Sequence, residues 1–156
     1  MSQRDNQRSK VYKAERLAWS VYDADARKPL TLLECQKIAN AVARSMTKKR
    51  NWGTMACATP VKIGVHFIGG TGWGRRAVAN NRWRTGRMIN LPEWGRTKAI
   101  VCHELAHHAA GLEHGHDGRF VSSFIQLTRR FIGPVEAEIL KQAFLETRVK
   151  TRRIKA

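Results

Sequence analysis

Two histidines four residues apart, with a glutamate directly after the first, stand in the stretch His103-Glu104-Leu105-Ala106-His107. On an α-helix, residues four apart lie one above the other on the same face, so both imidazoles can reach one metal ion. Imidazole nitrogens are common ligands of Zn²⁺. The glutamate is offset around the helix and can take a proton from an attacking water molecule. The pattern predicts a zinc site with its general base, and the chemistry it indicates is hydrolysis.

The third metal ligand must come from elsewhere, because a catalytic zinc site usually has three protein ligands and one open position. The longer pattern that places a third histidine further along the same segment fails, since Ala110 and Glu113 stand where glycine and histidine would be needed. A polar, glycine-rich turn follows the helix, and it contains His114 and His116. Either histidine could fold back and complete the site.

The residues beyond this motif resemble a known family. His116-Asp117-Gly118-Arg119-Phe120 is similar to the His-Gly-x-x-Phe segment of SprT-like zinc metallopeptidases, and more closely to that of a group of small metallohydrolases of actinobacteria and their phages. The chain departs from this segment at Asp117, where the family has glycine. Residues 4–15 are also similar to the start of that group, so the likeness covers most of the chain.

The resemblance implies a fold, a cofactor and a set of roles. It implies a zincin-like minimal metallopeptidase with Zn²⁺ as cofactor and a protein or peptide as substrate. Glu104 would be the general base. The implied metal ligands are His103, His107 and His116. An alignment anchored on His114-Gly115 selects a different histidine, so His114 stays as the alternative third ligand.

Hydrophobic periodicity predicts the elements that must position these residues. We expect a first helix over residues 5–26, and a second that begins at the capping box of Thr31 and Glu34. Strands are expected over residues 61–68 and 86–91, and the metal helix from Thr97 to Gly111. Two further helices follow, the second beginning at Pro134. The order predicts an α+β fold with a small mixed sheet and an active-site helix carrying the two histidines.

The strand at residues 86–91 directly precedes the metal helix. In zinc peptidases of this general type, the last strand before that helix borders the cleft. We therefore expect an exposed edge on this strand, where backbone hydrogen bonds could hold an extended peptide.

The size and composition of the chain predict one domain. Its 156 residues favour a metallopeptidase domain over residues 1–147 and a basic tail over residues 148–156. No apolar stretch is long enough to suggest a membrane span or a signal peptide. Three cysteines at unrelated spacings fit a reducing compartment. We expect a monomer in the cytoplasm of a bacterium or of a phage-infected host cell.

Positive charge is the second strong signal. The formal net charge is +17, and no acidic residue occurs between Glu34 and Glu93. Within that span, arginines alternate with tryptophans, a pattern that can neutralise phosphates and stack on bases. The predicted nucleic-acid-binding residues are Arg75, Arg76, Arg82, Trp83, Arg84 and Arg87. We expect DNA or another polyanion as a partner, and SprT-like peptidases include enzymes that degrade proteins on DNA.

Three functions from different classes are compatible with these patterns. The first is a zinc metallopeptidase that acts on DNA-associated proteins. The second is a basic nucleic-acid-binding protein with a structural or vestigial zinc site. The third is a metal-dependent hydrolase of a small amide. Glu104 favours the first over the second, because a structural site has no need of a carboxylate between its ligands.

Overall fold

A computed structural model of the chain describes residues 5–21, 26–48, 61–65, 77–83 and 86–151. Within these ranges the chain forms an α+β arrangement of five α-helices and one three-stranded sheet. The helices are α1 (Arg8–Val21), α2 (Leu32–Lys48), α3 (Lys98–Ala110), α4 (Gly118–Phe131) and α5 (Pro134–Glu146). The strands are β1 (Lys62–Val65), β2 (Val78–Trp83) and β3 (Gly86–Leu91). Short 3₁₀ turns flank α3 at η2 (Glu93–Gly95) and η3 (Leu112–His114).

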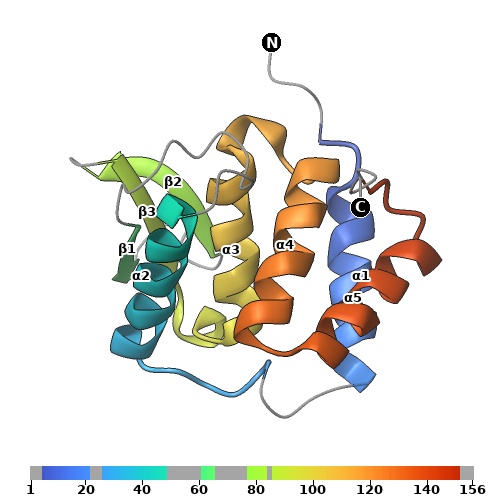
Figure 1. The fold of residues 1–156 in the computed structure, drawn as a ribbon, viewed down its shortest axis with the longest axis horizontal. Helices are drawn as coiled ribbons and strands as arrows, with labels where there is room; N and C mark the ends of the chain where they lie inside the picture. The colour runs from blue at the N-terminus through green and yellow to red at the C-terminus, as the bar shows by residue number, and fades with distance from the viewer. Residues whose placement is uncertain (1–4, 22–25, 49–60, 66–76, 84–85, 152–156) are drawn as a thin grey trace.

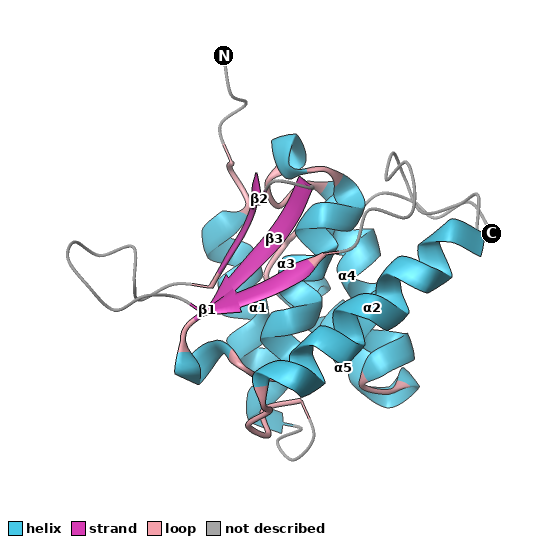
Figure 2. Ribbon diagram, turned by 90° about the vertical axis from the view of Figure 1, so that its left-hand side faces the viewer, coloured by secondary structure: helices cyan, strands magenta, loops and turns pink. Residues whose placement is uncertain are grey.

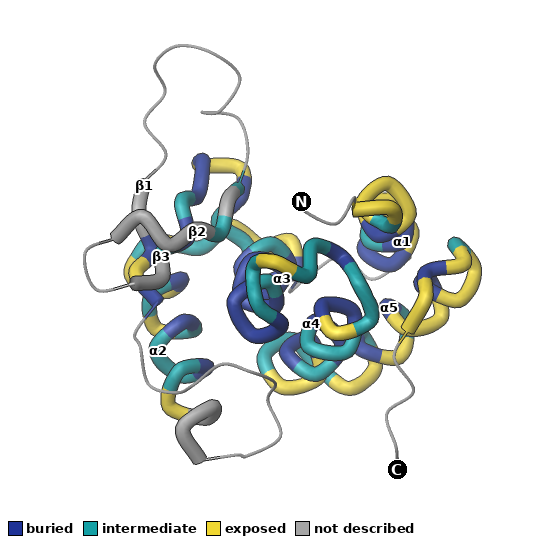
Figure 3. The backbone as a smooth tube through the Cα atoms, turned by 90° about the horizontal axis from the view of Figure 1, so that it is seen from above, coloured by how far each residue is buried: buried dark blue, intermediate teal, exposed yellow. Residues whose placement is uncertain are grey.

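Helix α3 lies in the middle of the molecule. The sheet and α2 lie on one side of it, and α4, α5 and α1 follow on the other (Figure 1). The sheet covers the helices on one side, as the view in Figure 2 shows. In Figure 3, α3 is mostly buried while the outer face of α1 is exposed. None of the helices in the described ranges has the length and apolar character needed to cross a membrane.

The sheet has the strand order β1-β3-β2, with β1 parallel and β2 antiparallel to β3. The expectation that residues 86–91 have an exposed edge is therefore wrong, because β3 is hydrogen-bonded on both sides. Strand β2 takes the edge position instead, and hydrophobic periodicity does not predict this strand. The outer side of β1 is covered by Gln36 of α2, which bonds the backbone of Val61 and Ile63.

The helix starts follow local capping chemistry. The Thr31 hydroxyl accepts from the Glu34 amide at 3.1 Å, and the Glu34 carboxylate accepts from the Thr31 amide at 2.7 Å, which confirms the predicted capping box. Thr97 caps α3 by accepting from the Ile100 amide. Helix α1 is shorter than predicted, since it begins at Arg8 rather than at residue 5.

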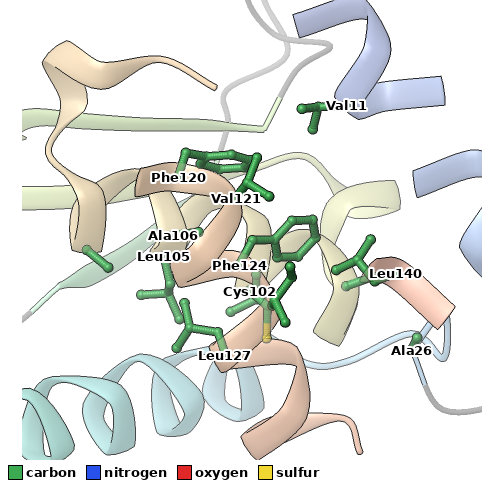
Figure 4. Packing of buried hydrophobic residues seen from close by; sticks show 14 of the residues in the cluster. Val11, Ala26, Cys102, Leu105, Ala106, Phe120, Val121, Phe124, Leu127 and Leu140 are labelled. Atoms are coloured by element: carbon green, nitrogen blue, oxygen red, sulfur yellow. The ribbon is translucent and has the colours of Figure 1, made fainter. Parts of the chain in front are cut away.

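The core joins α3 to α4. Phe120, Phe124 and Leu127 of α4 are fully buried and lie against the apolar face of α3 (Figure 4). Cys102 is buried in the same cluster, and burial raises the pKa of its thiol to about 12. This packing holds α3 rigidly, and α3 carries the first two candidate ligands.

The Leu127→Ala variant is expected to lose about 2–5 kcal/mol of unfolding free energy, because the substitution opens a cavity in a fully packed core. The matched control is Leu33→Ala on α2, where the leucine is 65% exposed and truncation should change stability by less than about 0.5 kcal/mol. Urea denaturation followed by circular dichroism measures both values. Equal losses in the two variants would contradict the core described above.

The packed chain continues past residue 147. Val149 is 5% exposed, and the amide of Lys150 donates to the Gln7 side chain at 2.5 Å. The Gln7 amide group also donates to the carbonyl of His116 at 2.9 Å. Gln7 thus ties the start of α1 both to the end of the folded chain and to the loop that carries a candidate ligand.

Candidate metal centre

Three histidine side chains meet between α3 and the loop that follows it. His103 and His107 lie one turn apart on α3, and His116 lies at the end of the loop before α4. One ring nitrogen from each lies within 4.8 Å of the other two, and this is the group of possible metal ligands found among the described residues. His103 Nε2 and His116 Nε2 are 3.3 Å apart. These are the three histidines that the family resemblance implies.

The loop between α3 and α4 turns back because of its glycines. Gly111 ends α3 with φ of 99°, a conformation that side chains rarely adopt. Gly115 has φ of 55°, and a Cβ there would lie 3.1 Å from the carboxylate of Asp5. Asp117 then caps α4 by accepting from the amides of Arg119 and Phe120. The reversal places His116 beside α3.

Each candidate ligand has a partner on its far side. Glu15 of α1 lies 2.9 Å from His103 Nδ1, and Asp5 lies 2.5 Å from His116 Nδ1. His107 hydrogen-bonds the backbone of Gly115. Carboxylate partners of this kind fix the ring orientation and tautomer of metal-binding histidines. With Nδ1–H donating to a carboxylate, Nε2 of His103 and of His116 carries a lone pair toward the shared space.

The geometry of the two Nε2 atoms fits a bound cation. Two lone pairs that face each other at 3.3 Å repel unless a proton or a cation lies between them. For a tetrahedral zinc ion with ligands at about 2.0–2.1 Å, the expected separation of two ligand nitrogens is about 3.3 Å. His103, His107 and His116 can therefore hold a divalent metal ion.

The titration behaviour of the rings follows from burial and from these carboxylates. Burial lowers the pKa of His103, but the charge and hydrogen bond of Glu15 and the charge of Glu104 together outweigh it, so the net pKa is raised. Burial, together with the charges of the neighbouring histidines, lowers the pKa of His107 to about 2. Burial also lowers the pKa of His116, although Asp5 opposes the shift. His107 and His116 are thus neutral at pH 7, the form in which imidazole binds metals.

Glu104 lies beside this cluster and is only 6% exposed. Its Oε2 accepts a hydrogen bond of 3.0 Å from the backbone amide of Ala79 in β2. Burial raises the pKa of its carboxyl, while the charge of His103 and the Ala79 amide oppose the shift. A raised pKa makes a carboxylate a stronger base. The residue is fixed in place by the sheet edge and is not itself in the histidine group.

The alternative third ligand, His114, lies outside the cluster. Its Nδ1 is 2.9 Å from Asp117, and its Nε2 is 3.0 Å from an Arg119 guanidinium nitrogen. Both ring nitrogens are therefore engaged away from the metal position. Asp117 hydrogen-bonds His114 and caps α4.

A cleft of about 1560 Å³ opens in front of the three histidines. Helix α1 forms one wall, and β2 with the first turns of α3 forms the other. The ring of Tyr12 on α1 stacks on that of His103, with centroids 5.5 Å apart and an interplanar angle of 5°. Tyr12 is 37% exposed, so its ring contacts both a candidate ligand and the open cleft.

The predicted nucleic-acid-binding residues are only partly described. Arg75, Arg76 and Arg84 lie outside the described residues. Arg82 and Trp83 belong to β2, and Arg87 belongs to β3. The structure therefore places part of the arginine and tryptophan pattern on two neighbouring strands of the sheet.

Sequence reasoning missed the contribution of the N-terminal segment. Asp5, Gln7, Tyr12 and Glu15 all contact the site, whereas hydrophobic periodicity predicts only that this segment forms a helix. The available signal was the helical spacing of Tyr12, Glu15 and Trp19, which places an aromatic and acidic face next to the buried one. Comparisons of the chain with protein-family models, with curated proteins and with solved structures give no match, so the likeness to SprT-like peptidases rests on the quoted residues.

Proposed function

We propose that the protein is a zinc-dependent metallopeptidase with a zincin-like active site. The observation that carries this proposal is the combination of three clustered histidines, two of them held by carboxylates, with a buried glutamate beside them in an open cleft. A site that only stabilised the fold would be closed by a fourth ligand. Here the histidines line a cleft that a substrate can enter.

In this proposal, metal binding and proton transfer are carried out by different residues. His103, His107 and His116 would hold the zinc ion, which when bound supplies a Lewis acid that polarises the carbonyl and acidifies water. Glu104 takes the proton of the attacking water and passes it to the leaving nitrogen. The Ala79 amide keeps the Glu104 carboxylate oriented.

The size of the cleft favours a peptide over a small amide. Its volume exceeds the about 300–1,000 Å³ typical of pockets for small molecules. Ala79 of β2 and Ala77, which directly precedes this strand, line it, and within the described residues β2 pairs only with β3. An extended peptide can add to such an edge through backbone hydrogen bonds.

Digestion of an unfolded protein such as casein, with products identified by mass spectrometry, tests this function. We expect zinc-dependent cleavage that stops on chelation and returns when zinc is restored. Protein that holds zinc and cleaves neither casein nor a DNA-bound protein would contradict the proposal.

We also propose that the chain associates with nucleic acid, since its formal net charge is +17. DNA binding should weaken steeply as salt rises. A chain that ends at Thr151 lacks Arg152, Arg153 and Lys155, and its log–log salt slope should fall by up to about 3, because each phosphate contact contributes about 0.9. Fluorescence anisotropy over a salt series measures the slope. Affinity that does not depend on salt would contradict this part of the proposal.

The carboxylates of Asp5 and Glu15 should increase the affinity of the site for zinc. Asp5→Asn and Glu15→Gln are each expected to weaken zinc binding by about 10- to 100-fold, because the carboxylates orient the ligand rings. Competition with a chromogenic chelator measures the affinity. The matched control is Glu113→Gln, which removes a carboxylate that is 71% exposed and lies near His114 instead. A loss in Glu113→Gln equal to that in the other two would contradict the assigned partners.

A further inference from the structure

The cleft extends beyond the histidines along α1. Tyr12 stacks on His103, and Arg16 lies one turn further along the same helix. Trp19 and Arg27 line the far end. At 1.5 Å of rise per residue, Arg16 and Trp19 lie about 6–10 Å along the helix from Tyr12. An extended peptide covers that distance in about two or three residues.

The far end of the cleft has a neutral hydrogen-bond donor, the indole of Trp19, and a positively charged one, the guanidinium of Arg27. Trp19 is 7% exposed, and no described residue accepts a hydrogen bond from its indole Nε1. A buried donor without a partner is costly, which indicates that an acceptor group belongs beside it. Arg27 donates to the carbonyl of Trp19 at 3.1 Å, and this bond holds the guanidinium at the end of α1.

The carboxylates among the described residues that line the cleft do not serve as that acceptor. Asp5 bonds His116, Glu15 bonds His103, and Glu104 accepts from the Ala79 amide. All three lie at the metal end. Within the described part of the chain, neither Arg16 nor Arg27 forms an ion pair with an acidic side chain. Among the described residues that line the cleft, the acids are therefore engaged at the metal end, and Arg16 and Arg27 lie toward the other end without an acidic partner.

We infer that Arg16, Trp19 and Arg27 bind a carboxylate of the substrate. That the ligand is a peptide rests on the proposed peptidase function. The preferred substrate carries an Asp or Glu side chain, or its own C-terminal carboxylate, two or three residues from the hydrolysed bond. Guanidinium groups with an indole N–H suit a carboxylate because all of them are donors and none is an acceptor.

Binding to the full-length, metal-free protein tests this inference without catalysis, and the absence of zinc keeps the metal from capturing the carboxylate. One octapeptide with blocked ends is prepared in two forms that differ by a single Glu or Gln. A third form has no acidic side chain and a free C-terminus, which distinguishes the two sources of carboxylate. Isothermal titration should give about tenfold tighter binding for a carboxylate peptide than for the Gln peptide.

Substitutions of Arg16, Trp19 and Arg27 test whether these residues form the carboxylate-binding subsite. In the Arg16→Gln/Arg27→Gln double variant, the ratio of the Gln-peptide to the carboxylate-peptide dissociation constant should fall to near one. The affinity for the Gln peptide should stay unchanged. Trp19→Phe keeps an aromatic ring in the core and should reduce the preference in part, with an unchanged melting curve. The matched control, Arg130→Gln, removes an exposed arginine on α4 and should keep the full preference.

Cleavage by the zinc-loaded protein separates this inference from the proposed function. If the peptides are cleaved, kcat/KM should follow the same preference as binding. Binding preference without cleavage would overturn the peptidase proposal and leave the carboxylate subsite in place. Equal or absent binding of the Glu and Gln peptides would overturn the subsite, whatever cleavage shows. A single-stranded oligonucleotide that binds through Arg16 and Arg27 in place of peptides would also overturn it.

Discussion

The Glu104→Gln variant is expected to bind zinc with the stoichiometry of the unmodified chain and to hydrolyse peptides about 10²- to 10⁴-fold more slowly, the range for loss of a general base. Glutamine has the same shape, and its amide oxygen can still accept the hydrogen bond from Ala79 that holds this side chain. It cannot take a proton from water. The measurement is kcat/KM on a fluorogenic peptide, alongside the zinc content of each protein.

The matched control for this experiment is Glu113→Gln, since Glu113 lies on η3 and away from the cleft. Its activity should equal that of the unmodified chain. Two results would count against the assigned role of Glu104: full activity in Glu104→Gln, or loss of zinc together with activity. The second result would mean that Glu104 is needed for the metal and not for proton transfer.

The second large effect is on zinc affinity. His116→Ala should weaken zinc binding by more than the about 10- to 100-fold that loss of an outer partner costs, because it removes a ligand outright. His114→Ala should leave the affinity unchanged, since both nitrogens of the His114 ring bond Asp117 and Arg119 instead. Chelator competition on the two variants gives the comparison.

Both variants remove one histidine from the same loop, so each serves as the control for the other. Circular dichroism melts show whether either substitution disturbs the fold. Loss of zinc affinity in His114→Ala with retention in His116→Ala would reverse the assignment of the third ligand. If both variants bound zinc as tightly as the unmodified chain, neither histidine would be a metal ligand.

The parts of the site that depend on local chemistry could be predicted from sequence. Helix α3 begins at the capping residue Thr97 and ends at Gly111, as expected. The spacing of His103 and His107 fixes their shared face once the helix is known. The strand over residues 86–91, the capping box and the start of α5 at Pro134 also follow from short-range signals, and all of them are found.

The choice between His114 and His116 could not be made from spacing. The contacts of Asp117 distinguish the two histidines, because Asp117 caps α4 and hydrogen-bonds the ring of His114, which keeps that ring away from the metal position. The effect depends on where α4 begins and on which way a loop with two positive-φ glycines turns. Sequence patterns locate such loops but do not fix their direction.

The carboxylate partners were missed because they come from distant parts of the chain. Asp5 and His116 are 111 residues apart, and Glu15 and His103 are 88 residues apart. No local pattern encodes contacts of that range. Strand β2 was missed for another reason: its sequence, Val-Ala-Asn-Asn-Arg-Trp, contains two asparagines, which strands disfavour, and β2 forms by pairing with β3.

The metal content and coordination shell of the purified chain test the central claim most directly. X-ray absorption at the zinc edge, together with elemental analysis, should give one zinc per chain with three imidazole ligands at about 2.0–2.1 Å and no sulfur ligand. A protein that purifies without zinc and takes up none, or one whose zinc is bound by cysteine sulfur, would contradict the site formed by His103, His107 and His116.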